Sequence, residues 1–525
     1  MLKTALMFKD HMILQRDKEI RIWGTALPGE TVTLTMQGGS WSCRADADGN
    51  WMISACPLRT SFSEEMKITA GEESLVYTDV QIGDVYLASG QSNMEFFMRY
   101  DADLKDELAV CANDNIRFFD YPEVSYPEQI NEADYGKNFG FWRKASPEDL
   151  EWFSAVGYYF AKDIQKRYDI PVGIIGCNWG GTPACAWMSR EAVEEAGEAW
   201  LREYEEGLKT LDLKAYNEQF PKNPAAWRMA PFEDPFTDML MRGASILDII
   251  RKLTGQEPDL SAMDPSAFVP VIGPKSELRP CGLYESMLRQ VAPYTLRGFL
   301  FYQGETDGDN HPELYRTIFP ALIRCFRSLW QEELPFLFVQ IAPFGSWMQS
   351  TGEPYIAIRE AQQMVSENVS GTGMAVITDV GMELDIHPKK KQPVGHRLAL
   401  QAMNRIYGET DVLCEAPTLS GAEIQPGKLI LSFVNAGTGL SLADHTPDGA
   451  ETDPTKPGGL QIFADGQVLD LSQVQAAADG SRLILDGPVF KEGMSAEIRL
   501  ACTGWYRVNL YNSAGIPARP AKIAI

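Results

Sequence analysis

The chain of 525 residues is 45% hydrophobic and 23% charged, an ordinary globular composition that excludes intrinsic disorder. Its formal net charge of −25 disfavours phosphate backbones and anionic bilayers, so neither a nucleic acid nor a membrane is expected as a partner. An anionic sugar is not excluded, because a local basic pocket can override the mean field of the surface.

The length of the chain indicates how many domains it has, and the N-terminal segment and the cysteines indicate its cellular compartment. At roughly 100–200 residues per domain, the length predicts about three domains. No stretch approaches the roughly 20 consecutive apolar residues that span a bilayer. The apolar run at the start is too short for a signal-peptide core, so a cytoplasmic location is expected. The nine cysteines are scattered without a CxxC pair, which favours buried thiols over disulfides or a zinc site.

Residues 1–80 are predicted to form a small antiparallel β-sandwich. Hydrophobic and polar residues alternate over 19–23 and over 31–36, the two-residue period of a half-buried strand. Turn signals such as Pro28-Gly29 separate these runs at short intervals.

Residues 81–410 alternate between apolar strands and helical sequence, which predicts a mainly parallel sheet covered by helices on both faces. The expected strands are 85–88, 171–176, 296–302, 335–341 and 374–378, and the clearest helices are 156–168 and 394–407.

An insertion over about 190–280 interrupts that alternation. The segment from Ser189 to Leu211 is acidic and amphipathic and predicts one helix with Ser189 as its N-cap, and 239–253 predicts another. Such an insertion often shapes access to a site. Residues 411–525 then return to short strands and predict a C-terminal β-sandwich-like domain; the clearest strands are 428–433, 459–463 and 482–485.

A serine follows the first strand of the α/β region, in Gly90-Gln91-Ser92-Asn93-Met94. Side chains at the carboxyl edge of a sheet face ligands, and a helix that begins there aims backbone N–H groups at a developing negative charge. The alternative is a helix N-cap serine in a tight turn. The motif differs from the α/β-hydrolase elbow, because Met94 replaces the second glycine.

Two further motifs follow strands. Residues 178–182 (Asn-Trp-Gly-Gly-Thr) carry paired glycines, which let a backbone N–H approach a substrate oxygen, although Gly-Gly after a strand is usually a turn. Residues 302–306 (Tyr-Gln-Gly-Glu-Thr) contain Gln303, whose amide can donate to an oxyanion if a carboxylate fixes its orientation. A polar strand end without a function is the alternative for this motif.

His387 is the fourth candidate, one of five histidines and the one preceded by a carboxylate, Asp385, in a loop before the last predicted helix. A serine hydroxyl needs a base to take its proton, and histidine is tuned for that near neutral pH. The alternative is a surface histidine. Parallel strands gather their carboxyl ends on one edge, so the four segments are expected to converge there as a hydrolase site.

The four motifs together resemble the SGNH hydrolase superfamily, in its branch of sialate O-acetylesterases and related carbohydrate acetylesterases. Further segments are similar to that branch: 12–16, 23–24, 49–51, 83–86, 156–161, 298–305 and 391–399. The resemblance covers roughly 10–190 and 280–405 and implies a flavodoxin-like sheet in the middle domain.

The resemblance implies a role for each motif. Ser92 is the expected nucleophile and His387 the base, with an oxyanion hole made by the Ser92 and Gly181 backbone N–H groups and the Gln303 side chain. The implied substrate-binding residues are Gln91, Asn93, Trp179 and Glu305. No metal and no organic cofactor is implied.

The acid partner of His387 stays open. The wider superfamily has Asp-x-x-His, but Leu384 occupies that position here. Asp385 is the preferred partner, Asp379 and Glu383 are the alternatives, and a Ser–His dyad is the remaining one.

The expected function is a serine esterase that hydrolyses O-acetyl esters on sugars, with a sialate O-acetylesterase as the first reading. An esterase of acetylated xylo- or manno-oligosaccharides is the second reading. A non-catalytic carbohydrate-binding protein is the rival from another class. A glycosidase needs two facing carboxylates, and nothing in the sequence places Glu95, Glu305 or Asp307 in such a pair.

Overall fold

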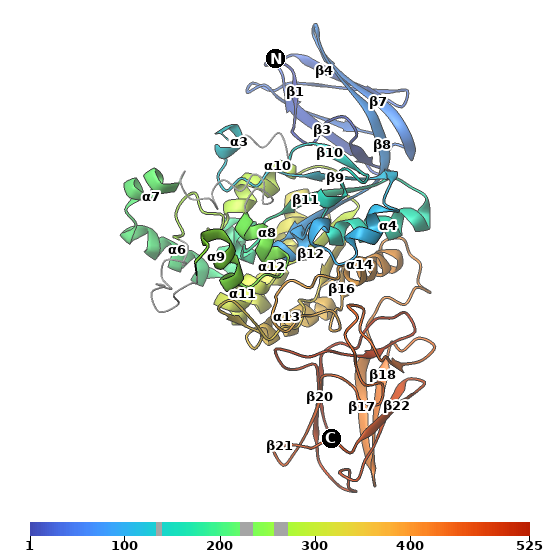
Figure 1. Ribbon diagram of the computed structural model, residues 1–525. Coiled ribbons are helices and arrows are strands. Elements are labelled where there is room, and N and C mark those ends of the chain that lie inside the picture. The colour runs from blue at the N-terminus through green and yellow to red at the C-terminus, as the bar shows by residue number, and fades with distance from the viewer. Residues whose placement is uncertain (133–138, 221–234, 257–270) are drawn as a thin grey trace. The chain divides into compact units, whose positions relative to one another are not determined.

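A computed structural model describes residues 1–132, 139–220, 235–256 and 271–525 (Figure 1). The chain divides into two compact units: the first unit holds 1–301 and 317–336, and the second unit holds 302–316 and 337–525. These units do not follow the predicted boundaries near 80 and 410, and the three-domain division stays a prediction.

The first unit begins with antiparallel β structure. One sheet has the order β1 (Lys3–Thr4), β3 (Ile20–Thr25) and β6 (Asn50–Ala55). Strand β4 (Thr31–Met36) pairs with β5 (Gly39–Arg44) and β7 (Ser61–Ala70). Alternate residues of β4 are buried, as its two-residue period predicts.

Strand β8 (Glu73–Gly90) joins this β structure to the central sheet without a break. Its first part pairs with β7, and its later part pairs in parallel with β2 (Ile13–Gln15) and β11 (Val172–Asn178). Burial alternates up to Tyr77 and becomes continuous from Val80 onward. The change of sequence character near residue 82 is therefore a change from a half-buried to a fully buried stretch of one strand.

The central sheet of the first unit has the order β10 (Trp142–Ala145), β9 (Asn113–Asp120), β11, β8 and β12 (Gly298–Tyr302). Strands β8 and β9 run parallel to β11, and β10 runs antiparallel to β9, so the sheet is mixed. Strands β9 and β11, which follow β8 along the chain, lie on one side of β8 in the sheet, and the later strand β12 lies on its other side. A strand at such a switch point presents its carboxyl end to ligands.

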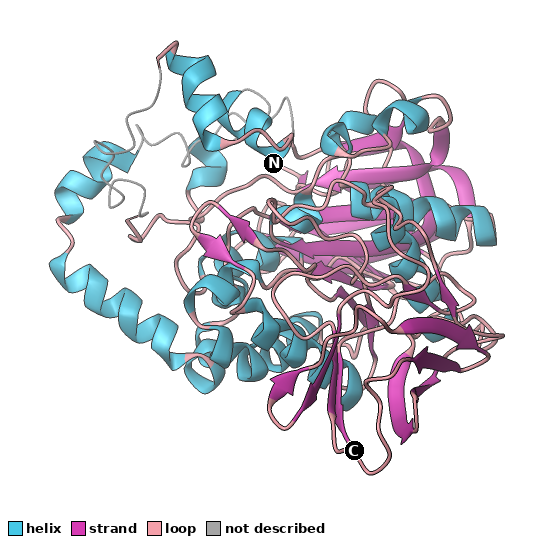
Figure 2. Ribbon diagram, turned by 60° about the horizontal axis from the view of Figure 1, so that its bottom comes forward, coloured by secondary structure: helices cyan, strands magenta, loops and turns pink. Residues whose placement is uncertain are grey.

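Helices accompany the strands of the sheet (Figure 2). Helix α4 (Ala155–Tyr168) packs against β9 and β11, and the Ser154 hydroxyl caps it by accepting the Gly157 N–H at 3.1 Å. The first unit also holds the described helices α1 (Ser92–Glu95), α2 (Leu104–Leu108), α3 (Gln129–Glu132) and α10 (Arg289–Val291), and α12 (Tyr315–Trp330) from residue 317 onward.

The predicted helix from Ser189 to Leu211 is wrong in one respect, because it is two helices. Ser189 caps α5 (Arg190–Ala196) as predicted, and α6 (Glu198–Thr210) begins after Gly197. A Cβ on Gly197 would lie 2.8 Å from Cδ1 of Ile318, so the chain bends where the packing leaves no room for a side chain.

The remainder of the insertion is described in part. Helix α7 (Leu213–Gln219) follows, and the segment predicted as one helix over 239–253 forms α8 (Pro235–Met241) and α9 (Ile246–Thr254), which flank Gly243 with φ +88°. Residues 221–234 and 257–270 of the predicted insertion lie outside the described residues.

The second unit pairs β13 (Phe336–Val339) with β16 (Thr372–Ala375) and carries α11 (Glu305–Asn310), α13 (Tyr355–Asn368) and α14 (Gln392–Arg405). A short hairpin, β14 (Ser346–Trp347) and β15 (Ser350–Thr351), lies between β13 and α13 along the chain.

Residues after 415 form antiparallel strands, as their sequence predicts. One sheet has the order β17 (Thr418–Gln425), β18 (Lys428–Val434), β23 (Arg482–Asp486) and β22 (Gln475–Asp479). Another has the order β21 (Gln467–Val468), β20 (Leu460–Ala464), β24 (Glu497–Leu500) and β26 (Ala521–Ala524). Residues from both sheets share one hydrophobic core, which includes Leu429, Leu483, Ile462 and Ile498.

Candidate active site

Ser92 lies where β8 ends and α1 begins. Gly90, with φ +138°, turns the chain out of the strand, and Gln91 is the N-cap residue of α1. The Gln91 carbonyl accepts the N–H groups of Met94 and Glu95, which holds the tight turn. Gln91 and Asn93 are buried and Ser92 is partly exposed, so the hydroxyl-bearing residue is the one of the three that reaches the surface.

The glycine motif lies beside Ser92 within the first unit. Asn178, the last residue of β11, pairs in register with Gly90, so the loop after β11 adjoins the turn after β8. A Cβ on Gly180 would lie 3.2 Å from Cβ of Ser92, which shows how closely the loop approaches the serine. Only a glycine fits there without displacing a neighbour.

Glu95 ties this loop to the serine turn, a contact that the sequence analysis did not identify. Its Oε2 accepts the Gly180 backbone N–H at 2.6 Å. Because Glu95 is one turn along from Ser92 in α1, this bond couples the position of the loop to that of the serine. The Gly180 N–H is used by this bond, and the next N–H along the chain belongs to Gly181.

Gly181 and Trp179 differ sharply in exposure. Gly181 is exposed and has φ +78°, a left-handed conformation that disfavours other residues. Trp179 is 2% exposed, and its carbonyl accepts the Thr182 hydroxyl at 2.7 Å. The first unit therefore brings Ser92 and Gly181 into neighbouring turns and buries Trp179.

Gln303 is fixed by hydrogen bonds within the second unit. Its Nε2 donates to Oδ2 of Asp307 at 2.5 Å, and its Oε1 accepts the Tyr315 hydroxyl at 3.0 Å. Both Gln303 and Asp307 are fully buried. Burial raises the pKa of Tyr315 well above its ordinary value, so its hydroxyl keeps the proton that it donates.

The backbone around Gln303 is fixed as well. Gly304 has φ +144°, and a Cβ there would lie 2.7 Å from Cγ2 of Ile358, so the position requires glycine. The Gln303 carbonyl accepts the Gln362 amide at 3.2 Å. Glu305, predicted to bind substrate, is 4% exposed at the start of α11.

His387 and Asp385 are in contact in the second unit. Oδ1 of Asp385 accepts the His387 backbone N–H at 2.8 Å and lies 3.2 Å from Nδ1 of the imidazole. The hydrogen bonds of Asp385, and Lys389 with Nζ 2.8 Å from Oδ2, outweigh burial and lower the pKa of this carboxyl. An ionised carboxylate only accepts hydrogen bonds, so Nδ1 carries the proton and Nε2 is the basic nitrogen.

The two alternative acids are placed differently. Asp379 is fully buried and forms a two-bond ion pair with Arg397, each bond 2.7 Å long. Glu383 is exposed, and its backbone carbonyl rather than its carboxyl is used, accepting the N–H groups of Gly345 and Ser346. Of the three candidate carboxylates, Asp385 is therefore the one in contact with the imidazole.

The electrostatics of His387 favour the neutral imidazole. Burial is the largest influence and lowers the pKa of His387 to about 4, although Asp385 acts in the opposite direction. The positive charges of Lys389 and Lys391 lower it further. A neutral imidazole at physiological pH is the form that can accept a proton.

Trp347 is a neighbour of His387 that the sequence analysis did not identify. The two ring centroids are 5.1 Å apart and the ring planes meet at 87°. Trp347 lies about 40 residues before His387, in a hairpin with no strand-end motif, so no local signal pointed to it.

Neither a metal-binding cluster nor a membrane-spanning helix is found among the described residues. Over the described residues, no three His, Cys, Asp or Glu side chains are grouped so that they could hold a metal ion. No described helix has the length and apolar character to cross a membrane.

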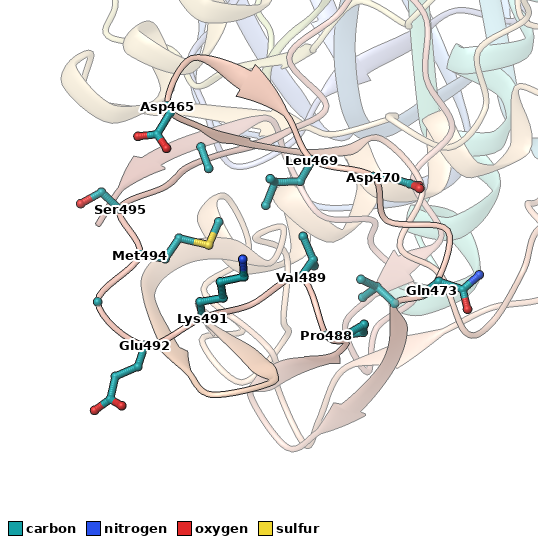
Figure 3. Close-up of a pocket in the computed structure, with 13 residues that line it drawn as sticks. Asp465, Leu469, Asp470, Gln473, Pro488, Val489, Lys491, Glu492, Met494 and Ser495 are labelled. Atoms are coloured by element: carbon teal, nitrogen blue, oxygen red, sulfur yellow. The ribbon is translucent and has the colours of Figure 1, made fainter.

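The C-terminal strands of the second unit carry an open pocket of about 800 Å³ (Figure 3). None of the predicted site residues lines it. Its lining comes from two chain segments and mixes apolar with charged side chains, among them Leu469, Val489, Met494, Asp465, Lys491 and Glu492.

Three comparisons with known proteins agree with one another. Residues 276–404 match the family model for "Carbohydrate esterase, sialic acid-specific acetylesterase". The sialate O-acetylesterase of Rattus norvegicus is 26% identical over 453 residues, 79% of this chain and 75% of that protein. The human sialate O-acetylesterase is 25% identical over 469 residues, 82% of this chain and 76% of that protein.

A solved structure extends the likeness to the whole chain. A carbohydrate acetylesterase from Xanthomonas citri superposes with a TM-score of 0.72 at 26% identity and covers 99% of both chains. The comparisons confirm the resemblance to the sialate O-acetylesterase and carbohydrate acetylesterase branch that the motifs indicate, and they identify this chain as a carboxylic ester hydrolase.

Proposed function

We propose that the chain hydrolyses O-acetyl esters of sialic acids through an acetyl-Ser92 intermediate. The observation that carries the proposal is the buried His387 imidazole with Nδ1 3.2 Å from Asp385, which leaves Nε2 as a base. Ser92 lies at the carboxyl end of the switch-point strand, where a nucleophile meets its ligand. A flavodoxin-like SGNH sheet that brings the two together is part of the proposal.

The reaction follows the serine esterase pattern. Nε2 of His387 takes the Ser92 proton while Oγ attacks the acetyl carbonyl carbon, and the carbonyl electron pair moves to oxygen. The Ser92 and Gly181 backbone N–H groups and the Gln303 amide stabilise this oxyanion. The C–O bond to the sugar then breaks, and His387 returns its proton to the departing sugar oxygen. Water, deprotonated by His387, releases acetate from Ser92 by the same steps.

The comparisons support an anionic rather than a neutral sugar, because residues 276–404 match a sialic acid-specific acetylesterase model and the similar curated proteins are sialate O-acetylesterases. Sialic acids carry a carboxylate, whereas acetylated xylo- and manno-oligosaccharides are neutral. The lysines near His387 do not carry this choice, because Lys389 is paired with Asp385 and Lys391 is fully buried.

Acetate release by wild type and Ser92→Ala tests the mechanism. With p-nitrophenyl acetate and with O-acetylated sialic acid, we expect the rate to fall by about 10⁴-fold or more in Ser92→Ala. Equal rates in the two proteins would contradict the acetyl-Ser92 intermediate. Sugar affinity without acetate release from any ester would instead favour a carbohydrate-binding protein.

A substrate panel separates the two esterase readings. If the substrate is a sialic acid, kcat/KM should be higher for O-acetylated sialic acid than for acetylated xylo- or manno-oligosaccharides. A higher kcat/KM for the neutral oligosaccharides would identify them, rather than sialic acid, as the substrate.

A further inference from the structure

A short hairpin is bonded to the loop that carries His387. The backbone N–H groups of Gly345 and Ser346 both donate to the Glu383 carbonyl at 2.9 Å, and the Gly352 N–H donates to the Gly345 carbonyl at 2.9 Å. A Cβ on Gly345 would lie 2.9 Å from that same Glu383 oxygen, so the two backbones are in direct contact. The hairpin therefore holds Trp347, the last residue of β14, at a defined place beside His387.

Trp347 covers part of the imidazole and is itself partly exposed. The two rings pack edge to face at 5.1 Å, and the His387 residue is 4% exposed. The residue after Trp347 is Met348, 56% exposed, and the residue after Glu383 is Leu384, 74% exposed. Each of the two bonded segments thus carries an exposed apolar side chain, one residue after Trp347 and three residues before His387.

The aromatic residues of the sequence motifs cannot offer such a surface. Trp179 is 2% exposed, and Tyr302 is fully buried. These two rings lie in the core, whereas Trp347 is partly exposed and contacts His387.

We propose that Trp347, flanked by Met348 and Leu384, is the platform that binds the pyranose ring of the sugar. The inference rests on the proposed function, because His387 must return its proton to the departing sugar oxygen and the sugar must therefore lie at the imidazole. One face of a pyranose presents C–H groups, whose partial positive charge matches the electron-rich face of an indole. Exposed methionine and leucine side chains extend that apolar surface.

The platform makes Trp347 a specificity-determining residue. An ester without a pyranose, such as p-nitrophenyl acetate, uses Ser92 and His387 but gains less from the indole. We expect the ratio of kcat/KM for O-acetylated sialic acid to kcat/KM for p-nitrophenyl acetate to fall about 10-fold in Trp347→Ala, mainly through KM of the sugar ester. Trp347→Phe keeps an aromatic face and should recover most of that ratio.

A binding measurement separates this inference from the proposed function. In the Ser92→Ala background, calorimetry with O-acetylated sialic acid measures affinity without turnover, and Trp347→Ala should raise Kd about 10-fold. Trp41→Ala is the matched control, because Trp41 is also a partly exposed tryptophan on a strand, β5, of the first unit. It should leave both the ratio and Kd at the wild-type values, and thermal unfolding checks that each variant is folded.

The possible outcomes distinguish the proposed Trp347 platform from the proposed esterase function. An unchanged Kd and an unchanged ratio in folded Trp347→Ala would overturn the platform while leaving the esterase intact. An equal loss on both esters would also overturn it, since Trp347 would then act only by packing on His387. Wild type that binds the sugar through Trp347 but releases no acetate would refute the proposed function and keep the platform.

Discussion

Gln303 donates a 2.5 Å hydrogen bond from Nε2 to Oδ2 of Asp307, and both side chains are fully buried. An amide side chain can turn over by exchanging its oxygen and nitrogen, but here an acceptor faces the nitrogen and the Tyr315 hydroxyl faces the oxygen. The amide therefore has one stable orientation. Because its bond to the nitrogen fixes that orientation, Asp307 is a positioning residue for the proposed oxyanion donor.

Replacing Asp307 with Asn tests this orientation. An Asn amide offers a donor as well as an acceptor, so the Gln303 amide can then turn its oxygen toward the site. We expect kcat to fall about 10²-fold with little change in KM, because the lost interaction is one made with the oxyanion. The control is Glu313→Gln, which neutralises an exposed carboxylate just after α11. A kcat of Asp307→Asn within twofold of wild type would refute the positioning role.

The pH dependence of the reaction follows from the lowered pKa of His387. The base must be neutral, and burial together with Lys389 and Lys391 lowers its pKa to about 4. Because the folded-state pKa lies below the ordinary value, kcat/KM should stay level as the pH falls from about 7 to about 5 and reach half its plateau near pH 4. Activity that halves near pH 6.5 would show an unshifted base.

Removing the Lys389 charge should shift the pH at which kcat/KM falls on the acidic side. Lys389→Ala removes a positive charge beside His387 and releases Asp385, and both changes favour the imidazolium. The pH of half-maximal kcat/KM for p-nitrophenyl acetate should therefore rise. Lys390→Ala removes a neighbouring lysine that is not among the influences on the His387 pKa, and its profile should match wild type. A downward or absent shift in Lys389→Ala would contradict this electrostatic account.

Glu95 should affect catalysis through the loop after β11, which carries Gly180 and Gly181. Glu95→Ala removes the acceptor of the Gly180 N–H and frees the loop that carries Gly181, so we expect kcat to fall about 10-fold. Glu95→Gln keeps an oxygen acceptor and should recover much of this loss. Steady-state kinetics of both variants, with exposed Glu148→Ala as the control, distinguish a lost hydrogen bond from a lost charge. Equal losses in Ala and Gln would indicate that the charge is what matters.

Substitution of Asp385 should impair catalysis, whereas substitution of Asp379 should impair stability. Asp385→Asn keeps the shape but loses the negative charge and introduces an N–H donor that can hold His387 in the other tautomer, so kcat should fall by about 10³- to 10⁴-fold. Asp379→Ala leaves the buried Arg397 guanidinium without its carboxylate and should lower the free energy of unfolding by about 3–5 kcal/mol. Denaturant unfolding and kinetics on both variants test this; a large kcat loss in folded Asp379→Ala would make Asp379 the acid.

Part of the site follows from local sequence. Gly90 before Ser92, and Gly304 after Gln303, stand where the backbone has positive φ at the end of a strand, and a strand–glycine–polar pattern is visible without a fold. The order of strands and helices is equally local, because the period of buried residues reports it. The helix over 189–211 shows the limit: its period is helical throughout, but the backbone leaves the helical region at Gly197 (φ −148°, ψ 38°), where Ile318 lies close by.

Contacts between distant residues could not be predicted in the same way. The Glu95–Gly180 bond joins residues 85 positions apart, and nothing near either residue identifies the other. Trp347 and His387 lie in segments with no shared motif, and contacts such as the bonds from Gly345 and Ser346 to Glu383 bring these segments together.

The sequence by itself determined the alternation of strands and helices, the polar residues at the strand ends and the kind of chemistry they support, since these depend on residue type and local period. Only the tertiary structure decided that Asp379, eight residues before His387, pairs with Arg397, which leaves the preferred Asp385 in contact with the imidazole. The physical reason is that a buried charge must find its partner through the packing of distant elements, and local spacing does not record which partner that is.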